Sequence, residues 1–202
     1  MKSIPVSEES NWVKRVSDLP LEQLAKTDKK MKIGITAATG QLGKLVVESL
    51  KQKVASENIV VLVRTPEKAS DLGVETKAFD YSNKATQVEA LKGIDTLLLI
   101  SGSEVGQREA QHANVIASAK EAGVKKIVYT SLLRADSSTL SLAVEHLATE
   151  KNLKESGLTY TILRNGWYTE NYTGSIGGAL AGGAFIGSAG DGKIASAARI
   201  DF

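Results

Sequence analysis

From Met31 onward, short apolar runs alternate regularly with segments of helical periodicity, and this alternation is the feature that most constrains the fold. The apolar runs are rich in β-branched residues, as expected for strands covered on both faces. The intervening segments carry apolar residues three and four positions apart, as amphipathic helices do. Such alternation is typical of α/β proteins in which right-handed crossovers build a parallel sheet. We therefore predict a doubly wound parallel sheet of about six strands.

The predicted elements follow one another without long gaps. The strands are expected at 32–36, 59–63, 75–78, 96–100, 126–130 and 159–163. The helices are expected at 41–53, 84–91, 107–122 and 140–156, with a short helical turn at 66–72. Beyond Arg164 the sequence is rich in Gly and Ala. There we predict a tight turn at Asp191-Gly192 and no further helix–strand pair.

Composition excludes several classes of function. The 202 residues contain no cysteine, which rules out disulfides, thiolate metal sites and cysteine nucleophiles within them. Two histidines form no metal-ligand pattern, so no metal is expected. A net charge of +2 is too small to indicate a nucleic-acid surface. No apolar run approaches the ~18 residues of a membrane helix, and no signal core is present, so we expect a cytoplasmic protein without membrane contact.

The junction between the first predicted strand and the first helix carries a glycine pattern. Gly40 would let the backbone approach phosphates, and Gly43 would let the helix pack closely on the strand. Helix N-terminal N–H groups and the positive end of the helix dipole favour an anion here. Ala37 replaces the first glycine of the usual pattern, at little cost if its φ is negative. These features predict a Rossmann-type dinucleotide site; a strand–helix turn without a ligand is the alternative.

Three more positions follow predicted strands at the same edge of the sheet. Arg64 follows the second strand, where its cation would meet a ribose 2′-phosphate and favour NADPH over NADH; a solvated surface arginine is the alternative. Asp80 follows the third strand and would reach the adenine, while Ser101 ends the fourth and would line the middle of the cofactor. The predicted cofactor residues of this part are Ala37, Ala38, Thr39, Gly40, Gln41, Leu42, Arg64, Asp80 and Ser101.

Several stretches resemble a known family. They are ATGQLG at 38–43, VRTP at 63–66, LLIS at 98–101, SEVGQR at 103–108, YTSLL at 129–133 and RNGWYTENY at 164–172. Together they resemble the NmrA-like group of atypical short-chain dehydrogenases, and within it the bacterial NADPH-dependent quinone oxidoreductases. The resemblance covers residues 31 to about 201, and the last stretch is its most specific part.

The resemblance implies roles for the loop after the sixth strand. Tyr168, Glu170 and Asn171 would contact the nicotinamide end of the cofactor, and Trp167 and Tyr172 would stack on nicotinamide or substrate, unless the rings only pack in the core. The polar composition of residues 1–30 sets them apart as an extension without assigned chemistry. The resemblance then implies an NAD(P)-binding Rossmann domain at 31–165 and, at 166–202, a cofactor and substrate loop that begins a C-terminal substrate subdomain. That subdomain is expected to be largely absent.

Conventional short-chain dehydrogenases use a Tyr-x-x-x-Lys helix motif, and this chain departs from it. Lys151 matches the lysine, but Leu147 stands at the tyrosine position. Lys151 is therefore the candidate catalytic residue and a candidate contact of the nicotinamide ribose, or else an exposed helix residue. His146 and Glu150 lie four apart on one helix face, and we interpret them as a surface pair rather than a catalytic dyad.

The missing tyrosine bears on the reaction. Ketone reduction creates an alkoxide whose conjugate acid has a pKa near that of water, roughly 16, so it needs a positioned acid. Quinone reduction creates a phenolate with a conjugate-acid pKa of about 10, which water can protonate. The expected function is NADPH-dependent quinone reduction by direct hydride transfer, with a homodimer as the candidate assembly. The alternatives are a non-catalytic NAD(P)-binding redox sensor of the NmrA type and a remnant without a stable fold.

Overall fold

The computed structural model describes residues 31–185, 187 and 190–202, which belong to one compact unit, 31–202. The predicted polar extension at 1–30 lies outside the described residues. Within the described ranges, no helix is long and apolar enough to cross a membrane.

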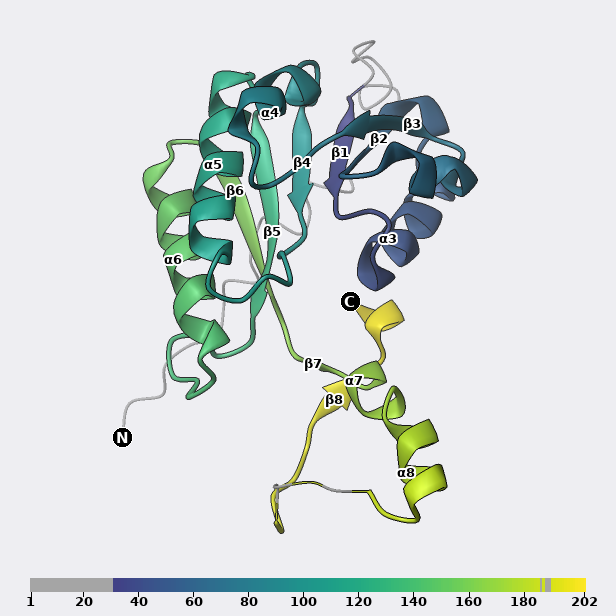
Figure 1. Ribbon diagram of the computed structural model, residues 1–202. Helices are drawn as coiled ribbons and strands as arrows, with labels where there is room; N and C mark the ends of the chain where they lie inside the picture. Colours follow the sequence, from purple (N-terminus) through teal and green to yellow (C-terminus); the bar gives the residue numbers. More distant parts are fainter. Residues whose placement is uncertain (1–30, 186, 188–189) are drawn as a thin grey trace, which may run out of the picture. The chain divides into compact units, whose positions relative to one another are not determined.

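Six parallel strands form the central sheet, in the order β3-β2-β1-β4-β5-β6 (Figure 1). This is the strand order of Rossmann folds, and it confirms the predicted fold class. The order reverses between β1 and β4, and ligands bind such sheets beyond the carboxyl ends of the strands at this reversal. The strands are β1 (Ile33–Thr36), β2 (Ile59–Val63), β3 (Glu75–Ala78), β4 (Thr96–Leu99), β5 (Lys126–Leu132) and β6 (Thr159–Asn165).

Helices cover both faces of the sheet. One face packs on α3 (Gln41–Lys51) and the 3-10 turn η2 (Pro66–Leu72), and the other on α4 (Lys84–Leu91), α5 (Arg108–Glu121) and α6 (Leu142–Glu155). A short 3-10 turn, η1 (Ser56–Asn58), precedes β2. Strand β2 explains the continuous apolar run. Val60 and Leu62 face the second group of helices, and the alternate residues Ile59, Val61 and Val63 face the first. All of β2 is buried, which is why its sequence does not alternate.

The segment after β6 differs from the prediction. It contains β7 (Trp167–Tyr168), α7 (Glu170–Thr173), α8 (Ile176–Gly182), β8 (Ser196–Ala197) and the 3-10 turn η3 (Arg199–Asp201). Because β7 and β8 pair in parallel around the two helices, the expectation of no further helix–strand pair is wrong. The turn lies at Gly190–Asp191 and closes no hairpin. Helix α8 is made almost entirely of small residues, so its sequence shows no apolar periodicity.

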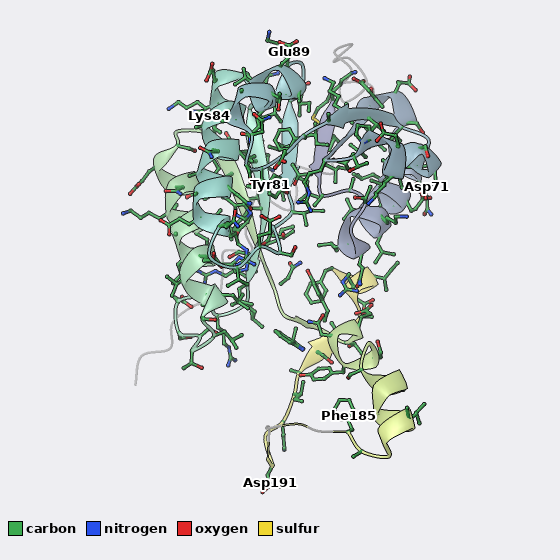
Figure 2. The ribbon with its side chains drawn as sticks, viewed as in Figure 1. Asp71, Tyr81, Lys84, Glu89, Phe185 and Asp191 are labelled. Carbon is green, nitrogen blue, oxygen red and sulfur yellow. The ribbon has the colours of Figure 1, made fainter. Side chains whose placement is uncertain are left out.

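The partly buried Tyr81 ties the loop after β3 to the point where the strand order reverses. Figure 2 shows Tyr81 directed inward, whereas Lys84 and Glu89 point away from the core. The Tyr81 hydroxyl lies 2.7 Å from the Ile100 carbonyl oxygen and 2.6 Å from Oγ1 of Thr36. The same Thr36 oxygen accepts the Ile100 N–H at 2.9 Å. These bonds hold the ends of β1 and β4 together below the expected ligand position.

Helix α3 packs unusually close to the end of β1. A Cβ on Gly43 would lie 2.4 Å from the Ala37 carbonyl oxygen and 2.6 Å from Cα of Ala38, so no larger residue fits. We expected alanine to replace glycine at position 37 at little cost in free energy if its φ were negative. Its φ is 50°, in the left-handed region, so the alanine is strained. The turn thus carries strain at Ala37 and relies on glycine at Gly43, and it brings the start of α3 to the carboxyl edge of the sheet.

We predict that Gly43→Ala lowers the free energy of unfolding by about 2 kcal/mol, because backbone atoms must move to admit the methyl group. Gly177→Ala is the matched control: it also lies in a helix, but its Cβ would meet nothing within 4 Å. There alanine should be neutral or stabilise by up to about 1 kcal/mol. Urea unfolding of both variants tests this, and equal effects would contradict the close packing of α3.

Candidate active site

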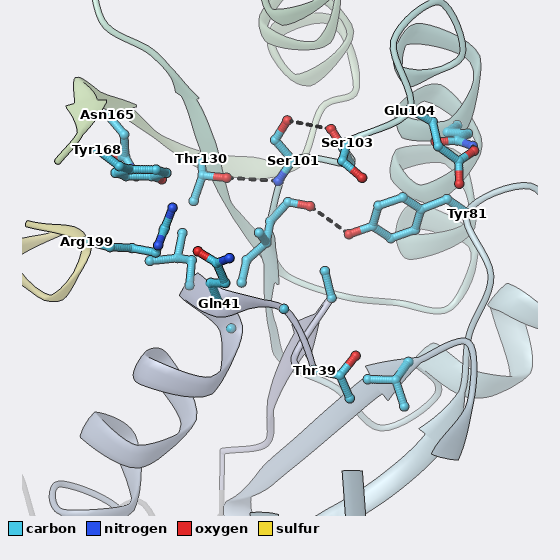
Figure 3. A pocket seen from close by; sticks show the side chains of 18 of the residues that line it. Thr39, Gln41, Tyr81, Ser101, Ser103, Glu104, Thr130, Asn165, Tyr168 and Arg199 are labelled. Carbon is cyan, nitrogen blue, oxygen red and sulfur yellow. Dashed lines mark hydrogen bonds between the residues drawn. The ribbon is translucent and has the colours of Figure 1, made fainter. Parts of the chain in front are cut away.

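A cavity of about 690 Å³ opens at the carboxyl edge of the sheet, over the reversal between β1 and β4. The ends of the strands, the start of α3, one face of α6 and the segment after β6 line it. Figure 3 shows Asn165, Tyr168 and Arg199 on one side with Gln41 beside Arg199, Tyr81 and Glu104 on the other side, Ser101 between the two groups and Thr39 below them. The predicted residues that line it are Ala37, Thr39, Gly40, Gln41, Leu42, Arg64, Asp80, Ser101, Trp167, Tyr168, Glu170 and Asn171.

The start of α3 is built to receive an anion. Gly40 is its N-cap, no side chain caps it, and its first turn holds no acidic residue. The N–H groups of the first helical turn have no partner inside a helix, so a ligand at this end can accept their bonds. A Cβ on Gly40 would lie 3.1 Å from the Ala37 carbonyl oxygen, so a side chain at this position would crowd the turn. A phosphate group therefore fits the chemistry of the turn.

Two cations stand next to this turn. Arg64, at the end of β2, is 70% exposed and forms a 3.1 Å ion pair with Glu104. Glu104 also accepts a 2.7 Å hydrogen bond from the Gln111 amide, which restrains its carboxylate. Lys68, from η2, lines the cavity as well, and its position was not predicted. The end of β2 thus presents a cation where an adenosine ribose phosphate is expected.

The segment after β6 forms another wall of the cavity. The Asn165 amide donates a 3.0 Å hydrogen bond to the Tyr168 hydroxyl, and the Arg199 guanidinium lies 4.6 Å from the centre of the Tyr168 ring. The carboxylate of Glu170 accepts the backbone N–H of Arg199 at 2.9 and 3.0 Å. This N–H holds the pKa of Glu170 below its usual value. Glu170 therefore fastens the turn η3 to the cavity wall.

The face of α6 that meets the cavity is not the one that the Tyr-x-x-x-Lys match of Lys151 predicted. Leu142 and His146, four residues apart, line the cavity. Lys151 is exposed on the helix surface, 4.0 Å from Glu155, and is not among the lining residues. The match of Lys151 to the Tyr-x-x-x-Lys motif therefore does not bring it to the site. Ala38, buried under α3, and Tyr172, whose ring lies 6.5 Å from that of Trp167, also lie outside the lining.

The interpretation of His146 and Glu150 as a surface pair is wrong, because both side chains are buried. Glu150 is held instead by Arg164 from β6, at 2.9 and 2.8 Å, and by the Ser131 hydroxyl at 2.6 Å. Burial alone would raise the pKa of Glu150, but the hydrogen bonds from Arg164 and Ser131 outweigh it and keep it below the usual value. This bidentate pair ties α6 to β5 and β6.

Both histidines of the chain, His112 and His146, are buried, and each lies against the ring of Tyr129. Burial lowers the pKa of His112 to about 3 and that of His146 to about 4, and the nearby Arg108 guanidinium acts in the same direction. Between them stands Tyr129, whose pKa burial raises to about 12. Its hydroxyl lies 2.7 Å from Nδ1 of His146. At neutral pH this cluster is therefore uncharged.

Several lining residues were missed by sequence reasoning. Arg199 stands alone in a Gly- and Ala-rich stretch, and only the fold brings it to Tyr168. His146 was noticed for its spacing, but spacing alone does not say which helix face is buried. The other missed polar residues that line the cavity are Thr65, Lys68, Ser103, Glu104, Gln111, Thr130, Ser131 and Asn165. In the described part of the chain, no group of three or more His, Cys, Asp or Glu residues is arranged to hold a metal ion.

Residues 37–197 match the protein family described as NAD(P)H-binding. An NmrA-like family domain-containing oxidoreductase of Aspergillus flavus is 38% identical over 152 residues, which are 70% of this chain and 50% of that protein. The chain belongs to the NAD(P)H-binding, NmrA-like family. Membership agrees with the glycine turn, the open start of α3 and the 3-2-1-4-5-6 sheet.

Within this family, two comparisons show a high similarity to quinone oxidoreductases of Escherichia coli. Quinone oxidoreductase 2 of Escherichia coli is 58% identical over 173 residues, which are 84% of this chain and 60% of that protein. The crystal structure of an NADPH-dependent quinone oxidoreductase of E. coli complexed with NADPH superposes with a TM-score of 0.80 at 58% identity, over 84% of this chain and 61% of that one. The chain spans about 60% of the length of these relatives.

We predict a steep loss of stability in mild acid. The folded-state pKa values of His112 and His146, about 3 and 4, lie below the ordinary 6.5, so the unfolded chain binds one more proton at each histidine between pH 6.5 and 5. The free energy of unfolding should fall with pH there, with a slope approaching about 2.7 kcal/mol per pH unit. Urea unfolding across this range measures the slope, and His146→Gln should halve it. A flat profile would contradict the neutral buried pair.

Proposed function

We propose that this chain binds NADPH in the cavity and reduces quinones by direct hydride transfer. The observation that carries the proposal is the cavity itself, whose lining combines an uncapped helix start and Arg64 with Tyr168 and Trp167. The likeness to an E. coli quinone oxidoreductase crystallised with NADPH supports both the cofactor and the substrate class.

The residues present fit the parts of the cofactor. The N–H groups at the start of α3 would hold the pyrophosphate, and the room left by Gly40 admits it. Arg64, with Lys68 beside it, would meet the 2′-phosphate that distinguishes NADPH from NADH. Asp80 and Tyr81 would border the adenine side, and Ser101, Asn165 and Tyr168 the nicotinamide end.

The nicotinamide supplies a hydride when bound. The protein's contribution is to place the acceptor beside it and to exclude water. Trp167 lines the cavity and is partly exposed, and its flat aromatic ring suits a flat quinone. The cavity lining in the described residues holds neither a Tyr-x-x-x-Lys pair nor Lys151, which favours an acceptor whose reduced oxygen, with a pKa of about 10, needs no strong acid.

Nucleotide binding is the first test, by nicotinamide fluorescence with NADPH and NADH in parallel. Wild type should bind NADPH more tightly than NADH. Arg64→Ala should lower the affinity for NADPH about 10-fold and leave the affinity for NADH nearly unchanged, because one charge-assisted contact is lost. The matched control is Lys44→Ala, an exposed cation that pairs with Asp71 outside the cavity lining. If Lys44→Ala has the same effect as Arg64→Ala, a general loss of charge rather than a 2′-phosphate contact is responsible.

Turnover is the second test. NADPH oxidation with a benzoquinone, followed by absorbance, should be steady and should require the quinone. Saturable NADPH binding without any quinone-dependent oxidation would overturn the reductase proposal and favour the redox-sensor alternative. Gly166→Val should impair turnover while cofactor binding survives, because Gly166 joins the nicotinamide-side residues to Trp167.

A further inference from the structure

One side-chain nitrogen at the cavity, Nε2 of His146, is not used by the protein's own hydrogen bonds within the described residues. His146 reaches the cavity from α6, and its side chain is 6% exposed. Its Nδ1 is bonded to Tyr129, whereas Nε2 has no hydrogen bond with any residue of the described ranges. Within the same ranges, the one buried side-chain atom that lacks a partner is Oδ1 of Asn58. Nε2 is therefore not sealed in the protein interior but opens on the cavity that His146 lines.

The surrounding hydrogen bonds determine where the protons lie. The Gly102 N–H donates to Nε2 of His112 at 3.1 Å, so the neutral His112 carries its proton on Nδ1 and donates to Thr149 at 3.0 Å. The Thr149 hydroxyl then donates to the Glu145 carbonyl oxygen at 3.0 Å. The Tyr129 hydroxyl oxygen lies 2.7 Å from Nδ1 of His146, and we assign the phenol as the donor of this bond, because a phenol O–H donates more strongly than a neutral imidazole N–H and an imidazole nitrogen accepts more strongly than a phenol oxygen. A neutral His146 therefore carries its proton on Nε2, facing the cavity.

The charged groups around His146 leave this ring neutral. Arg108 from α5 opposes a second proton, whereas Glu145 and Glu150 on α6 favour one. Arg108 and Glu145 form an ion pair, and Glu150 is bound by Arg164, so both carboxylates already have a cation. Tyr129 from β5 covers the other edge of the ring and donates to it. Burial together with Arg108 outweighs the two carboxylates.

We propose that His146 donates a hydrogen bond from Nε2–H to the acceptor oxygen that becomes negative during reduction, and that Tyr129 is the positioning residue that keeps the proton on Nε2. This inference rests on the proposed quinone reduction. In the step, a hydride forms a new bond to the quinone and an electron pair moves onto an oxygen, giving an aryloxide. His146 keeps its proton and stabilises that charge, and water later protonates the aryloxide.

The pKa values of His146 and Tyr129 favour a hydrogen bond from His146 to the acceptor oxygen over transfer of its proton to that oxygen. With a pKa of about 4, only about one His146 in 1,000 carries a second proton at pH 7, so it is a poor source of protons. Passing the Nε2 proton to the product would leave a charge on Tyr129, whose pKa of about 12 exceeds the value of about 10 for a phenol-like product. A neutral donor in a partly dry site still lowers the energy of the charged product.

The test uses 4-nitrophenolate as a stable mimic of the aryloxide and 4-nitroanisole as its uncharged counterpart. Each is titrated against the full chain, with and without NADP⁺, and the affinities are compared. Wild type should prefer the phenolate by about 10-fold, and His146→Phe should lose that preference. His146→Gln, which keeps an N–H near the position of Nε2, should retain part of it. Tyr129→Phe should weaken it, because the proton is then free to move to Nδ1.

Val144→Ala, on the exposed side of α6, is the matched control and should behave as wild type. In turnover, His146→Phe should lower kcat by about 100-fold with little change in NADPH affinity. An unchanged phenolate preference in both His146 variants would overturn the inference, as would a loss confined to NADP⁺ affinity, which would make His146 a cofactor contact. If NADP⁺ does not bind the wild-type chain, the proposed function is overturned instead. The two outcomes can be told apart because the phenolate preference is also measured without nucleotide.

Discussion

The site depends on how closely α3 approaches the end of β1. Only glycine at Gly43 permits that approach, and Ala37 accepts a left-handed backbone to complete the turn. The result is a helix whose uncapped first turn points into the cavity at the reversal of the strand order. Arg64, directly after the neighbouring strand β2, adds a cation to the lining of the same cavity.

A second constraint fixes the opposite wall. The buried carboxylate of Glu150 is stable only because Arg164 binds it with two bonds and Ser131 supplies a third. This cluster connects α6 to β5 and β6 and so sets which face of α6 meets the cavity. It places His146, one turn earlier on the same face, at the cavity and leaves Lys151 on the outside. A structural ion pair thus decides which α6 residues line the cavity.

The sheet and the phosphate turn could be predicted from the sequence because each is encoded locally. Strand β2 is a fully apolar run of five residues, and it was placed without error; α4 likewise has the predicted bounds. The register of α6 could not be predicted, because residues 146/150 and 147/151 fit a helical spacing equally well and only tertiary contacts distinguish them. Arg199 reaches the site through a parallel β7–β8 pair joined by a Gly- and Ala-rich helix, which has no periodicity to indicate it.

The central claim is that the start of α3 binds the phosphates of a nicotinamide dinucleotide. Backbone amide NMR of the chain during titration with NADP⁺ tests it most directly, because the claim concerns the N–H groups of Gln41, Leu42 and Gly43. The account predicts that these three amides shift most and become protected from hydrogen exchange, together with shifts near Arg64. Saturable shifts confined to other parts of the chain, or no shifts at all, would contradict it.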